Sequence, residues 1–370
     1  MIVDERQRIL AKNLVHYSCE VQPGENVLIE ASGVPYQFVN LIVREVFEAG
    51  AFPFVSLGDN KVKRELLRGG KEEYFKRMAK YDEYKMRDMQ AYIGIRGGEN
   101  SCELSDATGA RFYNEFYAGP VHNRLRVKNT KWVILRYPTE GMSELAGMST
   151  EAYEDFYFYV CCLDYKKMGE AMTPLVELMN KTDKVRIIAK DTDLTFSIKG
   201  IGAVKCKGDR NIPDGEVYTA PVKDSINGVI HYNVPSIEDG IKFEDVRLVF
   251  KDGKIVEATA NHTEEANKIF DTDAGARYVG EFSFGLNPCI KKAIGDILFD
   301  EKISGSIHFT PGCCYDDAYN GNTSAVHWDL VLCQTPECGG GEIWFDGVLV
   351  RKDGRFVLPE LQGLNPENLI

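Results

Sequence analysis

The chain has 370 residues, of which 44% are hydrophobic and 27% charged, and its 44 Lys+Arg against 56 Asp+Glu give a net charge of −12. This composition argues against an intrinsically disordered chain, and the length predicts two domains with sizeable cores. The acidic balance argues against a nucleic acid or an anionic membrane as partner, because binding to phosphate groups is chiefly electrostatic.

Export and membrane signals are weak in this sequence. We find no run of about 18 apolar residues, and the start MIVDERQRILAKN carries acidic residues where a signal peptide has a basic flank and an apolar core. Of the ten cysteines, two pairs are adjacent in sequence, Cys161–Cys162 and Cys313–Cys314, which is poor geometry for a disulfide within the pair. We therefore expect a cytoplasmic protein with reduced thiols.

The first half of the chain alternates helical and strand-like segments. Helical spacing of apolar residues predicts a helix over residues 4–19, and a short β-prone run predicts a strand over 26–32. Pro35 opens a second helical segment that Gly50 can end, and residues 51–57 predict the next strand. The two strands of this unit should be parallel. Two further strand-like runs, 90–95 and 131–135, continue an open α/β sheet.

The pattern changes after a long helical stretch at residues 150–180. We place the domain boundary after Thr182, which gives an N-terminal α/β domain over residues 1–182 and a mostly-β α+β domain over residues 183–370. The second domain has short alternating segments, hairpin turns and one helix. The turns are expected at Asp252-Gly253, Asp346-Gly347 and Asp353-Gly354, and the helix is expected over residues 264–270.

Motifs for nucleotide binding or a nucleophile are weak. Gly94-Ile-Arg-Gly-Gly98 follows a strand but matches neither the dinucleotide fingerprint nor a Walker loop, so we interpret it as a turn between sheet and helix. The sequence has no G-x-S-x-G elbow. Cys313 and Cys314 could be reactive or bind a soft metal, but ordinary buried thiols are the favoured interpretation.

Two of the six histidines lie in strand-like runs. His327 and Asp329, in AVHWDLV, would project from the same face of a strand, as half of a divalent metal site or as an oriented pair in a core. His308, in GSIHF, has apolar neighbours, and an ordinary core histidine is the alternative there. The other four are interpreted as surface or satisfied core residues: His16, His122, His231 and His262.

Two glutamates lie inside apolar strand patterns, Glu216 in NIPDGEVYTAP and Glu281 in YVGEFSFGLNP. Burying a carboxylate is costly unless it is paired or bound to a cation, so each needs a partner unless both point outward. Three carboxylates and two imidazoles together form a suitable ligand set for two divalent cations that share a bridging water. Such cations polarise a carbonyl and lower the pKa of the water.

At these residues the sequence resembles the metallo-aminopeptidase family that includes aminopeptidase T and aminopeptidase S, a thermophilic-type metalloprotease family. The likeness covers nearly the whole chain. Its segments are 21–29 (VQPGENVLI), 137–142 (YPTEGM), 146–149 (AGMS), 193–200 (DLTFSIKG), 211–221 (NIPDGEVYTAP), 280–288 (GEFSFGLNP) and 298–309 (LFDEKISGSIHF). The last three are the most specific.

The resemblance implies both a site and a function. Tyr315 matches the family's active-site tyrosine, and Glu301 matches a further glutamate that is an extra ligand or a general-base candidate. Members are cytoplasmic, need divalent metals such as zinc or cobalt, remove N-terminal residues from short peptides and form homodimers. We therefore expect a metal-dependent aminopeptidase with two divalent ions. The implied metal ligands are Glu216, Glu281, His308, His327 and Asp329.

In the leading hypothesis, a metal-activated water attacks the N-terminal peptide bond, a carboxylate takes its proton, and Tyr315 stabilises the oxyanion. Aromatic residues next to the ligands could wall the pocket for an apolar first side chain, but period-two alternation favours core positions for them. These residues are Phe282, Phe284 and Trp328.

Two other functions stay open. Two histidines and one carboxylate can hold iron(II) with open positions, so a mononuclear ring-cleaving dioxygenase on a related fold is one alternative. Retention of Glu216 and Glu281 argues against it, because such a triad needs no further carboxylates. The other alternative is a non-catalytic, metal-stabilised oligomeric or binding protein.

Overall fold

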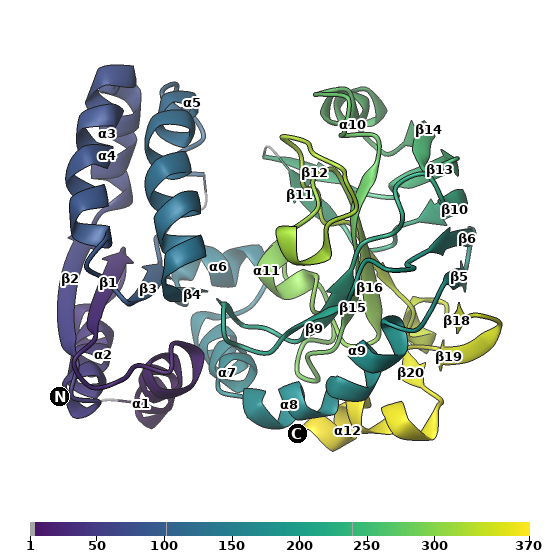
Figure 1. Ribbon diagram of the computed structural model, residues 1–370, viewed down its shortest axis with the longest axis horizontal. Helices are drawn as coiled ribbons and strands as arrows, with labels where there is room; N and C mark the ends of the chain where they lie inside the picture. Colours follow the sequence, from purple (N-terminus) through teal and green to yellow (C-terminus); the bar gives the residue numbers. More distant parts are fainter. Residues whose placement is uncertain (1–3, 101, 239) are drawn as a thin grey trace. The chain divides into compact units, whose positions relative to one another are not determined.

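The computed structural model describes residues 4–100, 102–238 and 240–370 (Figure 1). The chain divides into two compact units, the first comprising Met1–Cys162 and Gly208–Pro213, the second Leu163–Lys207 and Asp214–Ile370. The expected fold class, an α/β part and a mostly-β part, is confirmed. Within the described ranges, no helix combines the length and apolar character needed to cross a bilayer.

The first unit is built on a five-stranded parallel sheet in the order β2-β1-β3-β4-β8. The strands are β1 (Asn26–Ser32), β2 (Phe52–Gly58), β3 (Ala91–Arg96), β4 (Lys131–Arg136) and β8 (Asn211–Ile212). The first four strands agree with the predicted runs to within a residue at each end. The strand order places β1 and β3 side by side at the point where the chain reverses its progress across the sheet.

The helices of the first unit include those predicted at residues 4–19, after Pro35 and from residue 150, together with others that were not predicted. They are α1 (Glu5–Lys12), η1 (Asn13–Ser18), α2 (Tyr36–Glu48), α3 (Asn60–Gly69), α4 (Glu72–Met86), α5 (Ala110–Tyr113), η2 (Asn114–Val127), α6 (Glu140–Leu145) and α7 (Thr150–Cys161). Helix α2 begins directly after Pro35, which favours a first turn because it has no N–H to leave unpaired. Helix α4 and segment η2 bury apolar side chains against the sheet residues Leu28 and Tyr92.

The second unit contains two larger antiparallel sheets and a small hairpin. Its strands are β5 (Lys184–Ala189), β6 (Thr192–Ser197), β7 (Val204–Cys206), β9 (Glu216–Thr219), β10 (Asn227–His231), β11 (Ser236–Glu238), β12 (Ile241–Phe243), β13 (Arg247–Lys251), β14 (Lys254–Thr259), β15 (Val279–Gly285), β16 (Ser306–Pro311), β17 (Val331–Cys333), β18 (Gly341–Phe345), β19 (Val348–Lys352) and β20 (Arg355–Phe356). The helices are α8 (Tyr165–Ala171), α9 (Thr173–Met179), α10 (Thr263–Phe270), α11 (Ile297–Asp300), η3 (Asp316–Ala318), η4 (Pro336–Cys338), η5 (Pro359–Leu364) and α12 (Pro366–Leu369).

The three predicted hairpin turns are confirmed. They join β13 to β14, β18 to β19 and β19 to β20. Both residues of each turn have positive φ, as the two-residue turn that matches strand twist requires, and the aspartates tolerate this conformation better than most residues. Asp–Gly pairs between β-prone runs were therefore a reliable signal.

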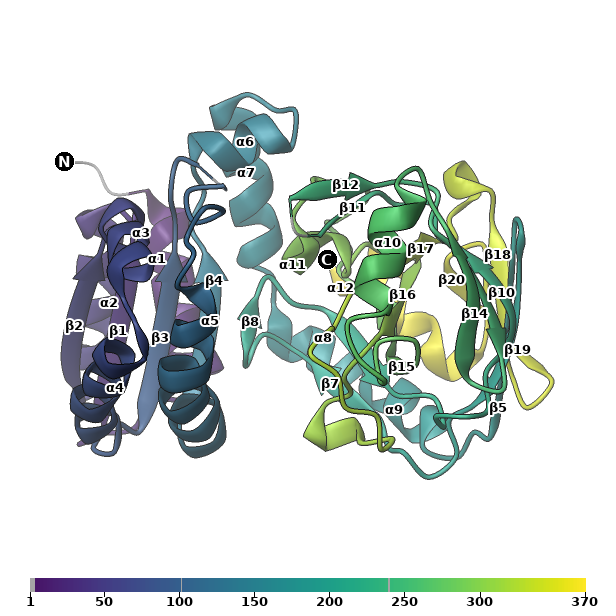
Figure 2. The same cartoon turned by 90° about the horizontal axis from the view of Figure 1, so that it is seen from above.

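The two larger sheets face each other (Figure 2), in the orders β14-β13-β10-β6-β5-β18-β19-β20 and β17-β16-β15-β9-β7. Phenylalanines fill the space between them: the rings of Phe196 and Phe282 lie 5.1 Å apart, and those of Phe250 and Phe309 lie 6.0 Å apart. Because successive side chains of a strand point to opposite faces, Glu281, next to Phe282, points away from this core. The polar residues of β15 and β16 therefore share the other face of the smaller sheet.

Candidate metal centre

Three neighbouring strands of the smaller sheet carry three of the expected ligands. Glu216 begins β9, Glu281 lies on β15 and His308 on β16, and these strands are adjacent in the order β16-β15-β9. The three residues are 7%, 3% and 1% exposed. Two carboxylates and an imidazole at this depth need charged or hydrogen-bonding partners, and they find them in one another.

One expectation about the fourth and fifth ligands is wrong: residues 325–331 do not form a continuous strand. His327 makes a single antiparallel bridge to Gly312, and β17 begins only four residues later. Between them, the N–H of Trp328 donates to the carbonyl of Pro311 at 3.0 Å, but proline has no N–H to return the bond. The hydrogen-bond ladder is therefore interrupted at this point.

The register is the same on both sides of the interruption. His308 pairs with Val331, and Gly312, four residues after His308, pairs with His327, four residues before Val331. Alternation is preserved, so His327 and Asp329 face the same side as His308, as the i, i+2 spacing predicted.

The five side chains converge on two groups that share one carboxylate. Glu281 Oε1 lies 3.1 Å from His308 Nε2, and Glu281 Oε2 lies 3.3 Å from His327 Nε2. Glu216 Oε2 is 3.5 Å from His308 Nε2, and Asp329 Oδ1 is 3.4 Å from His327 Nε2. In each group one potential ligand atom per residue lies within 4.8 Å of the others; the groups are Glu216–Glu281–His308 and Glu281–His327–Asp329.

Backbone carbonyls orient both imidazole rings. His308 Nδ1 lies 3.1 Å from the carbonyl oxygen of Glu301, and His327 Nδ1 lies 2.8 Å from that of Cys313. A carbonyl oxygen only accepts, so each Nδ1 carries the hydrogen and each Nε2 points at the carboxylates. This arrangement, with one ring nitrogen fixed by a carbonyl and the other directed inward, is the usual one for a metal-binding histidine.

The residues fit a pair of divalent cations. Within the described part of the chain, the buried atoms Glu216 Oε2 and His327 Nε2 have no hydrogen-bond partner. An unpaired buried polar atom costs about 1–3 kcal/mol, and a bound cation would supply the missing partner. Imidazole nitrogens and carboxylate oxygens are the donors that zinc and similar ions take.

Three further charged or ligand-type residues at this site were not predicted from the sequence. Lys302 is completely buried, forms an ion pair with Glu301 and lies 3.9 Å from Glu216 Oε1. Cys206 and Asp214 form a third group with Glu216. The signals were weak: Lys302 follows Glu301 in a run that otherwise looks like a surface turn, and Asp214 stands two residues before Glu216.

Tyr315 lies on the exposed side of the site. Its side chain is half-exposed, and its ring centre is 4.8 Å from that of His327 and 5.6 Å from that of Tyr218. The aromatic residues adjacent to the ligands belong to the core, so the pocket-wall alternative is wrong. Phe282 and Phe284 are completely buried, and Trp328 is almost completely buried.

All ten cysteines, each within the described ranges, are free thiols, as expected. The Sγ of Cys314 donates to the carbonyl of Asn322 at 3.1 Å, and that of Cys313 to the carbonyl of Cys314 at 3.3 Å. The structure therefore supports their interpretation as ordinary thiols.

Comparison with known proteins also indicates a metallopeptidase. A model of the thermophilic metalloprotease (M29) family matches residues 3–356. Aminopeptidase PepS of Streptococcus thermophilus is 23% identical, and the match covers 91% of this chain and 93% of that protein. Among solved structures, wild-type AmpT from Thermus thermophilus matches with a TM-score of 0.79 at 20% identity, covering 96% of this chain and 99% of that chain.

A second solved structure has the same fold but a different named activity. The 2,5-dihydroxypyridine dioxygenase from Pseudomonas putida KT2440 matches with a TM-score of 0.64 at 14% identity, covering 98% of this chain and 100% of that chain. At these identities the structural matches show the fold alone.

The family match spans both units and all five grouped side chains, so the resemblance seen in the sequence is confirmed. The chain therefore belongs to the thermophilic metalloprotease (M29) family and is a peptide-hydrolysing metalloenzyme.

Proposed function

We propose that this chain is an aminopeptidase that hydrolyses the N-terminal bond of short peptides with the help of two divalent cations. The observation that carries the proposal is the position of Glu281, whose two carboxylate oxygens are turned to different histidines. A carboxylate so placed can hold two ions at once. Glu216 and His308 would complete one ion's ligands, and His327 and Asp329 the other's.

When bound, such ions polarise the scissile carbonyl and lower the pKa of a water molecule. Zinc and cobalt suit this mixed set of nitrogen and oxygen donors, and we propose one of them as the resident metal. The acidic surroundings also favour a peptide's positively charged α-amino group. A site with five carboxylates nearby offers that charge several partners: Asp214, Glu216, Glu281, Glu301 and Asp329.

Glu301 is the proposed general base. Its carboxylate is buried close to Asp329 and His308 but belongs to neither ligand group. Lys302 forms an ion pair with this carboxylate and also lies near the carboxylate of Glu216. In this position Glu301 would take a proton from the attacking water and return it to the leaving amine.

Tyr315 is the proposed oxyanion stabiliser. Its ring lies against His327 at the exposed side of the site, from which a peptide can enter. A phenol O–H there would donate a hydrogen bond to the oxygen that becomes negative as water adds to the carbonyl. By resemblance to the family, we further propose that the protein is cytoplasmic and forms homodimers.

The test is metal titration of the stripped protein with leucine, phenylalanine and arginine chromogenic amides, using zinc, cobalt and manganese, together with elemental analysis. We expect turnover and two ions per chain at saturation. Glu281→Gln should abolish turnover, whereas Glu264→Gln, on the exposed surface of α10, should not. Absence of turnover with every metal would favour the non-catalytic alternative, and one iron per chain with oxygen uptake would favour the dioxygenase.

A further inference from the structure

The first unit has a cluster of polar residues at the carboxyl ends of β1 and β3. In the parallel register Glu30 lies opposite Gly94, and Ser32 lies opposite Arg96. The strand order β2-β1-β3-β4 reverses between these two strands. In open α/β sheets, ligands bind beyond the carboxyl ends of the strands at such a reversal. Groups that bind a ligand are therefore expected at this position.

Arg126, on η2, is the most buried cation there, with 4% exposure. One of its terminal nitrogens donates to Glu30 Oε2 at 2.8 Å, and its guanidinium lies 4.6 Å from the centre of the Tyr92 ring. Its Nε is also buried and, within the described ranges, has no hydrogen-bond partner. A buried guanidinium N–H without an acceptor carries a desolvation cost that no hydrogen bond offsets.

Two more cations share this position. Lys63 lies in the first turns of α3, with its Nζ 5.1 Å from the centre of the Tyr113 ring, and Arg96 is the last residue of β3. Neither forms an ion pair with any residue that the structure describes. We call Lys63, Arg96 and Arg126 the basic cluster.

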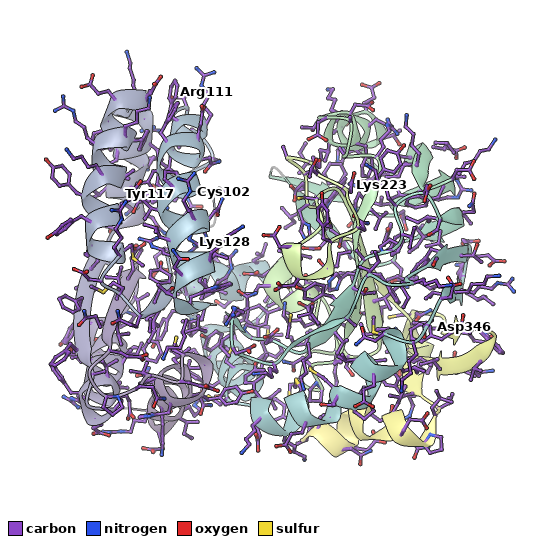
Figure 3. All side chains as sticks on the ribbon, in the orientation of Figure 1. Cys102, Arg111, Tyr117, Lys128, Lys223 and Asp346 are labelled. Carbon is purple, nitrogen blue, oxygen red and sulfur yellow. The ribbon has the colours of Figure 1, made fainter. Side chains whose placement is uncertain are left out.

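The positive charge of the basic cluster is only partly balanced. Glu30 supplies one carboxylate for three cations. Asp82 is already engaged, because it accepts a hydrogen bond from Tyr117 (Figure 3) at 2.8 Å and lies 3.7 Å from Lys85. The local excess stands out in a chain whose net charge is −12.

Neighbouring titratable groups respond to this excess. Burial, and then the charge of Arg96, lower the pKa of Lys63. Burial, and then the charges of Arg126 and Arg96, likewise lower the pKa of His122. Burial alone would act in this direction, and the contributions of Arg96 and Arg126 add a positive potential that an anion would neutralise.

The glycines of the Gly94–Gly98 run have a structural reason at this place. A Cβ on Gly94 would lie 2.9 Å from the Tyr92 ring, so glycine lets that ring lie flat beneath Arg126. A Cβ on Gly97 would collide with the carbonyl oxygen of Gly33, so glycine lets the loops after β1 and β3 meet. The run that matched no nucleotide motif thus shapes the floor of the basic cluster.

We propose that the basic cluster binds an oxyanion, the phosphate or carboxylate group of a small ligand. Arginine guanidinium groups match such groups with paired N–H donors, and Lys63 adds a third charge. The rings of Tyr113 and Tyr117, stacked 5.0 Å apart, lie beside the cluster and can contact the rest of the ligand. The basic cluster shares no residue with the proposed metal centre, and the proposal does not depend on the aminopeptidase activity.

The test is calorimetric titration of the full-length, metal-depleted protein with inorganic phosphate. Metal depletion keeps phosphate from binding at the other centre. Arg96→Gln and Lys63→Gln should each raise the Kd for phosphate by about tenfold, as loss of a charge-assisted hydrogen bond does. Arg77→Gln removes the same charge from an exposed ion pair with Glu73 on α4 and should leave the Kd unchanged. Arg126 is left intact, since its removal would strand Glu30.

A second titration separates the two sources of the oxyanion. Trialanine with a free carboxyl group and its C-terminal amide are each added in competition with phosphate. Displacement by the acid but not the amide indicates a peptide carboxylate, and displacement by neither indicates a phosphate ligand. A Kd equal in Arg96→Gln, Lys63→Gln and Arg77→Gln, or no binding of phosphate to the unmodified protein, would overturn the proposal. A selenate soak with no anomalous peak beside Arg126 or Arg96 would do the same.

Discussion

Thr310 holds the carboxylate of Asp329, since its Oγ1 donates a 2.7 Å hydrogen bond to Asp329 Oδ1. That oxygen is also the one that lies 3.4 Å from His327 Nε2. Thr310 is completely buried on β16, so its hydroxyl has a fixed position. The strand thus places His308 directly and orients Asp329 through Thr310.

Thr310→Val should therefore weaken metal binding without removing a ligand. Loss of a residue that orients a ligand typically costs about 10–100-fold in metal affinity. We expect a loss of this size for the ion next to Asp329, measured by competition with a chromogenic chelator. Thr310→Ser keeps the hydroxyl and should retain most of the affinity; equal losses in both variants would show that the hydrogen bond is not the cause.

The shared position of Glu281 predicts a pattern of metal stoichiometry. Glu216→Gln should weaken binding of the ion next to His308 only, and Asp329→Asn binding of the ion next to His327 only. Glu281→Gln should weaken binding of both ions. Elemental analysis after dialysis at a fixed free-metal concentration gives one, one and fewer than one ion per chain in these variants. A Glu281→Gln protein that keeps one tightly bound ion would contradict a bridging role.

Metal uptake should release protons. Burial alone would lower the pKa of His308 and of His327, but the neighbouring carboxylates outweigh it and raise both to about 10. Both rings are therefore protonated in the metal-free protein below about pH 10, whereas a metal binds only the neutral ring. Burial also raises the pKa of Glu216 to about 8. Near pH 8 we therefore expect two protons from the rings and a fraction of one from Glu216 to be released on saturation, and affinity that rises with pH.

Calorimetry in two buffers of different ionisation enthalpy counts these protons. The His231→Gln protein is a suitable control, because this histidine lies on β10, outside the ligand groups, and forms an ion pair with exposed Asp245 at 3.5 Å. The His231→Gln protein should release as many protons on metal binding as the unmodified protein. A proton count near zero would mean that the rings are already neutral before the metal binds.

Local sequence patterns predicted the first four strands of the parallel sheet, the three Asp–Gly turns and the shared face of His327 and Asp329. The alternation of Phe282 and Phe284 with polar neighbours placed Glu281 on the outer face of a strand before the sheet was known. The same rule placed His327 and Asp329 together even though the strand itself is interrupted opposite Pro311. Alternation survives a broken ladder, because it depends on extended backbone and not on hydrogen bonds.

Features set by distant parts of the chain could not be predicted. The order β2-β1-β3-β4 and the packing of α9 against β7 and β9 depend on pairings far apart in sequence. Burial of Lys302 is of the same kind: a lysine next to a glutamate looks like a surface pair until a second carboxylate, Glu216, is seen 3.9 Å away. For the same reason Asp214 and Cys206 could not be placed beside the site from local pattern alone.

Lys302 leads to a prediction about stability. Among the described residues, Lys302 is the only lysine or arginine that forms an ion pair with Glu216 or Glu301; the other cationic partner is a histidine, His308. Lys302→Met would leave these buried carboxylates without the lysine ammonium, and breaking a buried pair from one side costs about 3–5 kcal/mol. We expect a loss of that size in the free energy of unfolding of the metal-free protein, measured in urea.

A double-mutant cycle isolates the cause. Adding Glu301→Gln to Lys302→Met removes one unpaired carboxylate, so the double variant should be more stable than Lys302→Met alone. The pair of exposed Lys352 with partly buried Glu342, 3.2 Å apart, is the matched control, because Lys352→Met should change stability by less than about 1 kcal/mol. If Glu301→Gln instead made Lys302→Met less stable, the ion pair would not be what keeps Lys302 in the interior, and packing of its aliphatic chain would be the better explanation.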